Sequence, residues 1–342
     1  MTYTLPYSRG EARAWARENM SGVANVVIPT FTTDLETLNE EAIRHDIRRE
    51  IECGFWGTLL VSETATTNGE YIDFFRYAQE EAKDSLHLIH HASHNSLEEN
   101  ISVAQRSQEV GASLVLLGYP PTFYPHTEED LYEYTRTFCD SIDVAVMIFP
   151  VPLWGFERIH PSAGFSPNLI EKLLDDIPNI VAIKAEGGMP SVGGFVDVFR
   201  RFSDRVIVTE PIESNGIPMA TLLDMPFMGT SNYEYYGDRI PAIFALARSG
   251  KHNEAMDNYW KLSNARKANS QAMGHLAGAN FLHRMLWKYQ GWLNGWNGGP
   301  LRAPTMRLLD GQMNSLRAGL ISAGLPVSEG DNAEFFIGRN PK

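Results

Sequence analysis

The chain has 342 residues, of which 43% are hydrophobic and 21% charged, a composition typical of an ordinary globular protein. Its 42 acidic and 29 basic residues give a net charge of -13, which disfavours a nucleic acid or an anionic membrane as the main partner. Two cysteines exclude a disulfide scaffold, residues 1–20 lack the apolar segment of a secretory signal, and no apolar run is long enough to span a membrane. We therefore expect a cytoplasmic protein with no nucleic-acid or membrane partner.

Short apolar runs alternate with amphipathic stretches along most of the chain. Each run has the length expected of a buried parallel strand. The predicted strands are Ala24–Thr30, Gly57–Ser62, Leu86–His91, Ser113–Gly118, Val144–Pro150, Ile180–Lys184, Val206–Glu210 and Pro226–Gly229.

The stretches between the strands carry helix signals. Thr127 stands three residues before Asp130, a capping-box-like pattern that begins a helix. Ser166 is a natural N-cap, and Pro167 suits the first helical position. After Tyr236 only helix signals remain. The predicted helices are Glu40–Cys53, Ser96–Val110, Thr127–Cys139, Ser166–Leu174, Arg239–Ser249, Asn253–Asn269, Gly274–Gln290 and Thr305–Ala323.

Strands that alternate with helices predict a parallel sheet, either open and doubly wound or closed into a barrel. The eight predicted strands favour the closed (β/α)8 TIM barrel, and no Gly-x-Gly-x-x-Gly follows the first strand to indicate a dinucleotide site. We predict a barrel over residues 21–237, a C-terminal helical region over 238–325, and terminal extensions at 1–20 and 326–342.

Lys184 is the most informative candidate for chemistry, because it ends a predicted strand. Active sites of TIM barrels lie at the carboxyl ends of the strands. A lysine there, partly removed from water, is expected to lose its proton more easily and to form a Schiff base with a carbonyl substrate. The alternative is a structural lysine that pairs with nearby Glu186.

Five segments of the chain together carry a family resemblance. They are Gly22–Phe31, Ile51–Gly57, Gly111–Ser113, Asn179–Lys184 with Gly187 and Gly188, and Gly299–Pro304. By their order and spacing, rather than by any single motif, the chain from about Ser21 to Pro326 resembles the dihydrodipicolinate synthase / N-acetylneuraminate lyase family of class I aldolases. The resemblance implies a TIM barrel, an imine on Lys184, 2-oxo acid substrates and no cofactor.

Two departures from the family pattern concern how the substrate is held and how protons move. The family's Gly-Thr-Thr-Gly-Glu loop, which holds the substrate carboxylate, corresponds to Leu60–Glu63 without gaps, or to Thr66–Glu70 with an insertion. Ser62, Thr66 and Thr67 are the predicted carboxylate ligands; the alternative is a turn that caps the next helix. The family's proton-shuttling tyrosine corresponds to Phe149, in Phe149–Pro152, and phenylalanine has no hydroxyl.

Another group must then move protons, and histidines near the third strand are candidates. His87, His90, His91 and His94 lie close together in sequence, but adjacent strand residues point to opposite faces, so a metal site is not indicated. We predict that His91, His94 or Glu63 acts as the acid–base group. Further residues at or near strand ends are expected to contact the substrate; they are Tyr119, Tyr124, Phe149, Glu210 and Thr230.

The sequence thus predicts a Schiff-base lyase, an aldolase or hydratase-aldolase that makes or breaks a C–C bond of a 2-oxo acid. Aromatic residues such as Trp154 and Phe156 favour a substrate with an aromatic group. The alternatives are a sugar-acid dehydratase with the same imine, a metal-dependent hydrolase, and a family member that binds a keto acid without turning it over. The resemblance and the aromatic residues Trp287, Tyr289 and Trp292 predict a homotetramer.

Overall fold

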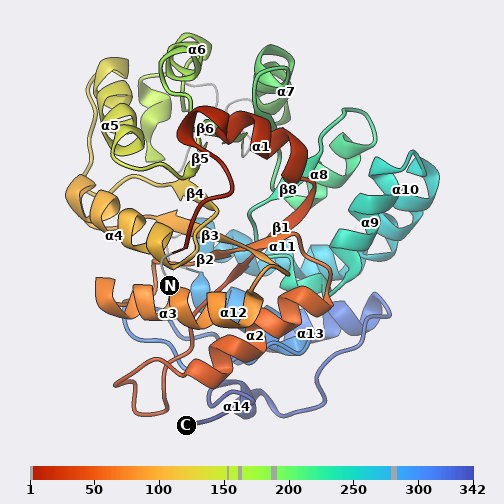
Figure 1. The fold of residues 1–342 in the computed structure, drawn as a ribbon. Helices are drawn as coiled ribbons and strands as arrows, with labels where there is room; N and C mark the ends of the chain where they lie inside the picture. Colours follow the sequence, from red (N-terminus) through yellow and green to blue (C-terminus); the bar gives the residue numbers. More distant parts are fainter. Residues whose placement is uncertain (1–2, 152–153, 161–163, 186–190, 279–282) are drawn as a thin grey trace. The chain divides into compact units, whose positions relative to one another are not determined.

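The computed structural model describes residues 3–151, 154–160, 164–185, 191–278 and 283–342 (Figure 1). Eight strands form one sheet, and an α-helix lies between each pair of successive strands in the sequence. The strands are β1 (Gly22–Val27), β2 (Gly57–Leu60), β3 (His87–Ala92), β4 (Leu114–Leu117), β5 (Ala145–Ile148), β6 (Ile180–Lys184), β7 (Ile207–Thr209) and β8 (Phe227–Gly229).

The sheet closes on itself. Its strand order is β7-β6-β5-β4-β3-β2-β1-β8, so the first strand is the parallel neighbour of the last. On the other side of β8, the backbone N–H of Gly229 donates to the hydroxyl oxygen of Thr209, at the end of β7, over 3.2 Å. Eight parallel strands in this order define a (β/α)8 barrel. The TIM-barrel fold predicted from the sequence is therefore confirmed.

Helices follow each of the first seven strands, and a helical region follows the eighth. The helices of the barrel are α2 (Glu40–Glu52), α3 (Asn68–Ala82), α4 (Leu97–Val110), α5 (Glu128–Asp140), α6 (Pro167–Asp176), α7 (Ser191–Phe202) and α8 (Glu213–Ala220). The C-terminal helices are α9 (Arg239–Arg248), α10 (His252–Lys261), α11 (Ser263–Gly278), α12 (Arg284–Leu293), α13 (Asp310–Ser322) and α14 (Asn332–Phe335). Before β1 lie the 3-10 helix η1 (Arg9–Glu11) and α1 (Ala12–Asn19), and further 3-10 helices are η3 (Phe156–Arg158) and η4 (Glu234–Tyr236).

Local capping explains where two of the barrel helices begin. The Thr127 hydroxyl accepts a hydrogen bond from the Asp130 N–H, and the Asp130 carboxylate accepts from the Thr127 N–H, so α5 starts at Glu128. The Ser166 hydroxyl accepts from the Leu169 N–H, and Pro167 occupies the first position of α6. These side chains satisfy N–H groups that a helix start leaves unpaired. Both helix starts agree with the sequence prediction.

The C-terminal helices differ from the prediction in their boundaries. The helix predicted over 253–269 is two helices, because the chain turns at Leu262, where ψ is near 0° and the side chain is buried. The helix predicted to start at Thr305 starts at Asp310, since Leu309 is extended. In the stretch 274–290, α11 runs to Gly278 and α12 begins at Arg284, while residues 279–282 lie outside the described residues. The spacing of apolar residues does not reveal interruptions of one to a few residues between helices.

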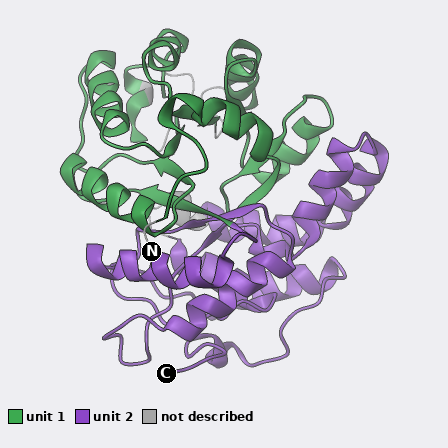
Figure 2. Cartoon of the chain, viewed as in Figure 1, with its two compact units in different colours: residues 1–24, 87–231 green, residues 25–86, 232–342 purple. Residues whose placement is uncertain are grey.

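The chain divides into two compact units (Figure 2). The first unit, residues 1–24 and 87–231, holds β3 to β8 and the start of β1. The second unit, residues 25–86 and 232–342, holds the rest of β1, β2 and the C-terminal helices. The boundaries at residues 237 and 325 inferred from the sequence stay a prediction. Among the described residues, no helix combines the length and the apolar character that crossing a membrane requires.

The closure of the barrel generates a testable prediction at Gly229. A Cβ atom added there would lie 2.6 Å from the Ala24 carbonyl oxygen, and the residue has φ +154°. Gly229→Ala should therefore lower the free energy of unfolding by about 2 kcal/mol or more, because backbone at this contact cannot move away cheaply. Urea denaturation measures the change. The control is Gly311→Ala in α13, where nothing lies within 4 Å of the added Cβ. Equal stability of the two variants would contradict the close approach of β8 to β1.

Candidate active site

Lys184 ends β6 and is buried, with 6% of its surface exposed. It pairs in register with Thr209 of β7. Its Nζ lies 3.9 Å from the centre of the Phe149 ring, which follows β5. The Trp154 indole N–H donates to the Phe149 carbonyl oxygen over 2.8 Å and so fixes the backbone that carries this ring. A lysine amine at a strand end, placed against an aromatic face and largely shielded from water, is suited to attack a carbonyl carbon.

The ends of β7 and β8 supply two buried polar side chains in the same unit. Glu210 is fully buried, and one of its carboxylate oxygens accepts the Ile212 N–H at the start of α8. Thr230, directly after β8, is also buried. Both were predicted substrate contacts. The hydrogen bond of Glu210 is structural. Substrate contact by Glu210 and Thr230 stays a prediction.

The histidines of β3 are separated by the strand's alternation. The His90 ring accepts or donates a 2.9 Å hydrogen bond with the Ser107 hydroxyl of α4, which places His90 on the helix side of the sheet. Successive strand residues face opposite sides, so His91 faces the interior of the barrel. His94 stacks on His90, with ring centres 5.8 Å apart. Burial lowers the pKa of His94 to about 4, so this ring is neutral at pH 7. Within the described part of the chain, no three His, Cys, Asp or Glu side chains gather as metal ligands.

The two tyrosines predicted near the end of β4 lie in very different surroundings. The Tyr119 hydroxyl forms a 2.8 Å hydrogen bond with the Thr135 hydroxyl of α5, and burial raises the pKa of Tyr119 far above its usual range. Its hydroxyl is therefore used in strand–helix packing. Tyr124 is 64% exposed, and the Arg158 guanidinium lies 3.9 Å from its ring centre. The Tyr119 ring meets the Trp154 ring at 5.8 Å, and Trp154 in turn meets Phe149, so Tyr119 belongs to the aromatic cluster behind the Lys184 contact.

The loop after β2 belongs to the second unit, and its threonines serve a helix start. The Thr67 hydroxyl accepts the Glu70 N–H, and the Glu70 carboxylate accepts the Thr67 N–H. Arg302 donates to both oxygens of that carboxylate, over 2.9 and 2.8 Å. Thr67 thus caps α3, as in the alternative drawn from the sequence. Ser62 is buried and Thr66 is half-buried.

Glu63, the other predicted acid–base residue, forms an ion pair with Arg284 of α12. Only 9% of the Arg284 side chain is exposed. Its guanidinium also lies 4.6 Å from the Trp287 ring centre, and its Nε finds no acceptor among the described residues. Sequence reasoning missed Arg284, which is 221 positions away from Glu63 and carries no motif. A buried guanidinium with a spare N–H is a candidate carboxylate receptor.

A second buried lysine, Lys288, also escaped the sequence analysis. Its Nζ donates to the Pro29 carbonyl oxygen over 2.5 Å and to the Thr30 hydroxyl over 2.7 Å, just after β1. Burial lowers the pKa of Lys288 to about 7, against the attraction of Asp46, and burial raises the pKa of Asp46 to about 6. The lowered pKa by itself would make Lys288 an alternative to Lys184 for imine formation. Its two hydrogen bonds to the backbone and side chain after β1 indicate a structural lysine.

Fold and site together define a (β/α)8 barrel whose sixth strand ends in a buried lysine. The chain belongs to the dihydrodipicolinate synthetase family, whose model matches residues 19–285. It is similar to 4-hydroxy-tetrahydrodipicolinate synthase of Methanopyrus kandleri, with 23% identity over 187 residues, which are 54% of this chain and 58% of the relative. The chain thus spans little more than half the length of this relative.

Solved structures support the fold at lower identity. Dihydrodipicolinate synthase from Aquifex aeolicus superposes with a TM-score of 0.74 at 20% identity, covering 90% of this chain and 100% of that one. The structure described as PhdJ bound to a substrate intermediate gives 0.73 at 16% identity, covering 94% and 97%. The segments predicted to resemble the family are described except for Gly187 and Gly188, which, like Pro152, lie outside the described residues.

Proposed function

We propose that this protein is a lyase that makes or breaks a C–C bond of a 2-oxo acid through a Schiff base on Lys184. The observation that carries the proposal is the buried amine at the end of β6, over the Phe149 ring. Membership of the dihydrodipicolinate synthetase family supports it. In the direction of cleavage, the Lys184 amine adds to the ketone carbon and water leaves, which gives an iminium. The hydroxyl on the leaving carbon gives its proton to the acid–base group, and the breaking C–C bond releases its electron pair into the iminium, which gives an enamine and an aldehyde. Protonation of the enamine and hydrolysis by water then release the shortened 2-oxo acid and the free Lys184 amine.

A substrate with an aromatic group is the finer proposal. Phe149 and Trp154 present aromatic surface beside Lys184, and their rings meet edge to face at 5.9 Å. Aromatic faces bind aromatic ligands with preferred geometry. The alternative of a sugar-acid dehydratase uses the same imine but needs polar groups for several hydroxyls. The aromatic surroundings of Lys184 favour the aromatic substrate over the sugar acid.

The first test is turnover by the Lys184→Met variant. Purified protein is incubated with aromatic 2-oxo acids that carry a cleavable bond, and with sugar acids, and the released aldehyde and pyruvate are measured. Lys184→Met should abolish turnover, because no amine remains to form the imine. The control is Lys172→Met, since Lys172 pairs with exposed Glu129.

Each outcome of this assay separates the alternatives. Dehydration of sugar acids without aldehyde release would favour the dehydratase. Loss of activity on chelation, with recovery only on adding metal, would favour a metal-dependent hydrolase. Full activity of Lys184→Met would refute the imine at this residue.

The second test concerns the acid–base group that replaces the missing tyrosine hydroxyl. We propose His91, which faces the barrel interior from β3, the same unit as Lys184. His91→Ala should slow single-turnover cleavage by about 10²–10⁴-fold. His94 has a pKa of about 4, so it is almost entirely neutral at pH 7 and is a poor general acid there. The control is His126→Ala, which removes an exposed histidine.

Phe149→Tyr tests whether a tyrosine hydroxyl at this position can carry the proton instead of His91. The added hydroxyl should not raise the rate greatly, because a pocket shaped around phenylalanine offers no partner for it. A wild-type rate for His91→Ala, together with a large gain for Phe149→Tyr, would contradict the assignment and indicate that the family's proton route persists.

Assembly and location stay proposals that rest on family resemblance. We propose a homotetramer in the cytoplasm. Of the three aromatic residues predicted to form an interface, Tyr289 and Trp292 are buried within the chain and do not support it, whereas Trp287 is half-buried. The Tyr289 hydroxyl instead forms a 2.8 Å hydrogen bond with the Asn332 side chain. Their burial follows from packing of α12 against the C-terminal segment, which composition alone did not indicate.

A further inference from the structure

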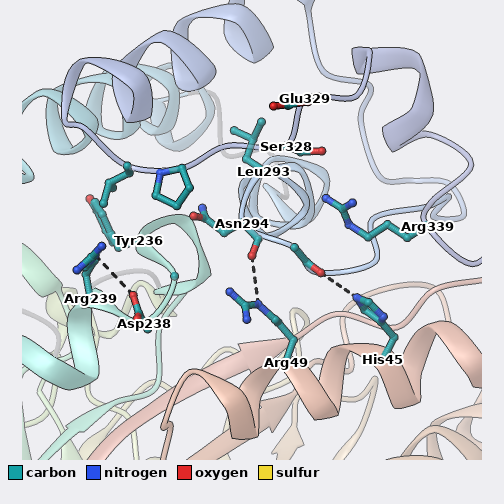
Figure 3. Close-up of a pocket in the computed structure, with 14 residues that line it drawn as sticks. His45, Arg49, Tyr236, Asp238, Arg239, Leu293, Asn294, Ser328, Glu329 and Arg339 are labelled. Atoms are coloured by element: carbon teal, nitrogen blue, oxygen red, sulfur yellow. Dashed lines mark hydrogen bonds and ion pairs between the residues drawn. The ribbon is translucent and has the colours of Figure 1, made fainter.

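A separate cavity of about 590 Å³ lies within the second unit (Figure 3). It is bounded by α2, by the turn before α9, by the end of α12 and by the C-terminal segment. Neither Lys184 nor any predicted substrate contact lines it. The lining residues are His45, Arg49, Tyr236, Gly237, Asp238, Arg239, Leu293, Asn294, Gly295, Leu325, Pro326, Ser328, Glu329 and Arg339.

The cavity gathers positive charge in a chain of net charge -13. Three arginines line it, against two carboxylates. Arg239 pairs with Asp238 at 3.5 Å, and Arg49 pairs with exposed Glu52 outside the cavity at 3.0 Å. Arg339 forms no ion pair with any residue that the structure describes, although Asp46 and Glu334 attract it from farther away. Arg339 therefore has no directly bound carboxylate among the described residues.

Backbone carbonyl groups hold these cations in place. Arg339 donates from Nε to the Trp296 carbonyl oxygen over 2.9 Å and from Nη2 to the Trp292 carbonyl oxygen over 2.8 Å. Arg49 donates to the Asn294 carbonyl oxygen over 3.2 Å, as Figure 3 shows. His45 bonds the Gly295 carbonyl oxygen over 2.8 Å. A carbonyl accepts a hydrogen bond, so these contacts neutralise no positive charge.

Capping of a helix end accounts for part of this arrangement. Cations near the carboxyl end of a helix such as α12 are favourable, because the last carbonyls carry partial negative charge. Capping does not account for the cavity, nor for two guanidinium groups near enough to repel. Burial lowers the pKa of Arg339, against the attraction of Asp46 and Glu334, and the charge of Arg49 lowers it a little further. No acceptor for the Arg339 Nη1 group is found among the described residues.

We propose that this cavity binds a small oxyanion with two or more negative oxygens, a phosphate group or a dicarboxylate. The anion accepts hydrogen bonds from Arg339 and Arg49, whose planar forks match both chemistries. Because both guanidinium groups are already held by backbone carbonyls, little side-chain freedom is lost on binding. The site is independent of the proposed lyase reaction.

The test is thermal unfolding of the full chain with inorganic phosphate or malonate at constant ionic strength. A bound anion stabilises the folded state by mass action, so a ligand at about five times its dissociation constant should raise Tm by about 2 °C. A rise with phosphate alone assigns a phosphate group, and a rise with malonate alone assigns a dicarboxylate. Chloride at the same ionic strength should give no rise.

Two variants locate the effect. Arg339→Gln should lose the rise in Tm, while Arg76→Gln, which changes an exposed arginine of α3, should keep it. Ser328→Glu is a second variant that keeps Arg339, so its result does not depend on whether Arg339→Gln folds. It places a carboxylate in the cavity, where the carboxylate competes with an added anion. It should raise Tm without added anion and remove the response to phosphate or malonate.

Absence of any anion-dependent rise in the wild-type protein would overturn the proposal. An equal rise in wild type, Arg339→Gln and Ser328→Glu would overturn it as well, since the anion would then act elsewhere.

Discussion

The contact between the Lys184 amine and the Phe149 ring is the interaction on which the account of this molecule depends. The barrel places the end of β6 beside the end of β5, so the amine meets an aromatic face instead of open water. The indole of Trp154 holds the backbone of Phe149. In the function proposed for this chain, the flat apolar face of Phe149 suits an aromatic substrate. Because phenylalanine has no hydroxyl, the same proposal requires another group to carry protons.

The polar side chains of the loop after β2 are also engaged in contacts within the chain. Thr67 and Glu70, which matched the family's carboxylate loop in one alignment, are used to begin α3 and to bind Arg302. Glu63 is held by Arg284. A buried charge needs a partner, and removing one member of a pair is costly. The pair of Arg284 with Glu63 therefore keeps both charges compensated within the second unit.

Sequence reasoning predicted the barrel because buried parallel strands carry continuous apolar runs, and it predicted helix starts such as Thr127 and Ser166 because capping is local. It placed Lys184 at a strand end for the same reason. It did not find Arg284, Lys288 or Arg339, because their partners lie far away in sequence and depend on how the C-terminal helices pack. It also read Tyr289 and Trp292 as surface residues, since an aromatic residue in an amphipathic helix does not reveal which neighbour covers it.

The central claim is that Lys184, rather than the other buried lysine, carries the imine. Borohydride reduction in the presence of a turned-over 2-oxo acid converts an imine into a stable amine that peptide mass spectrometry can locate. The account predicts one adduct for each chain, on the peptide that contains Lys184. An adduct on Lys288, whose pKa of about 7 makes it the chemical competitor, would contradict the account.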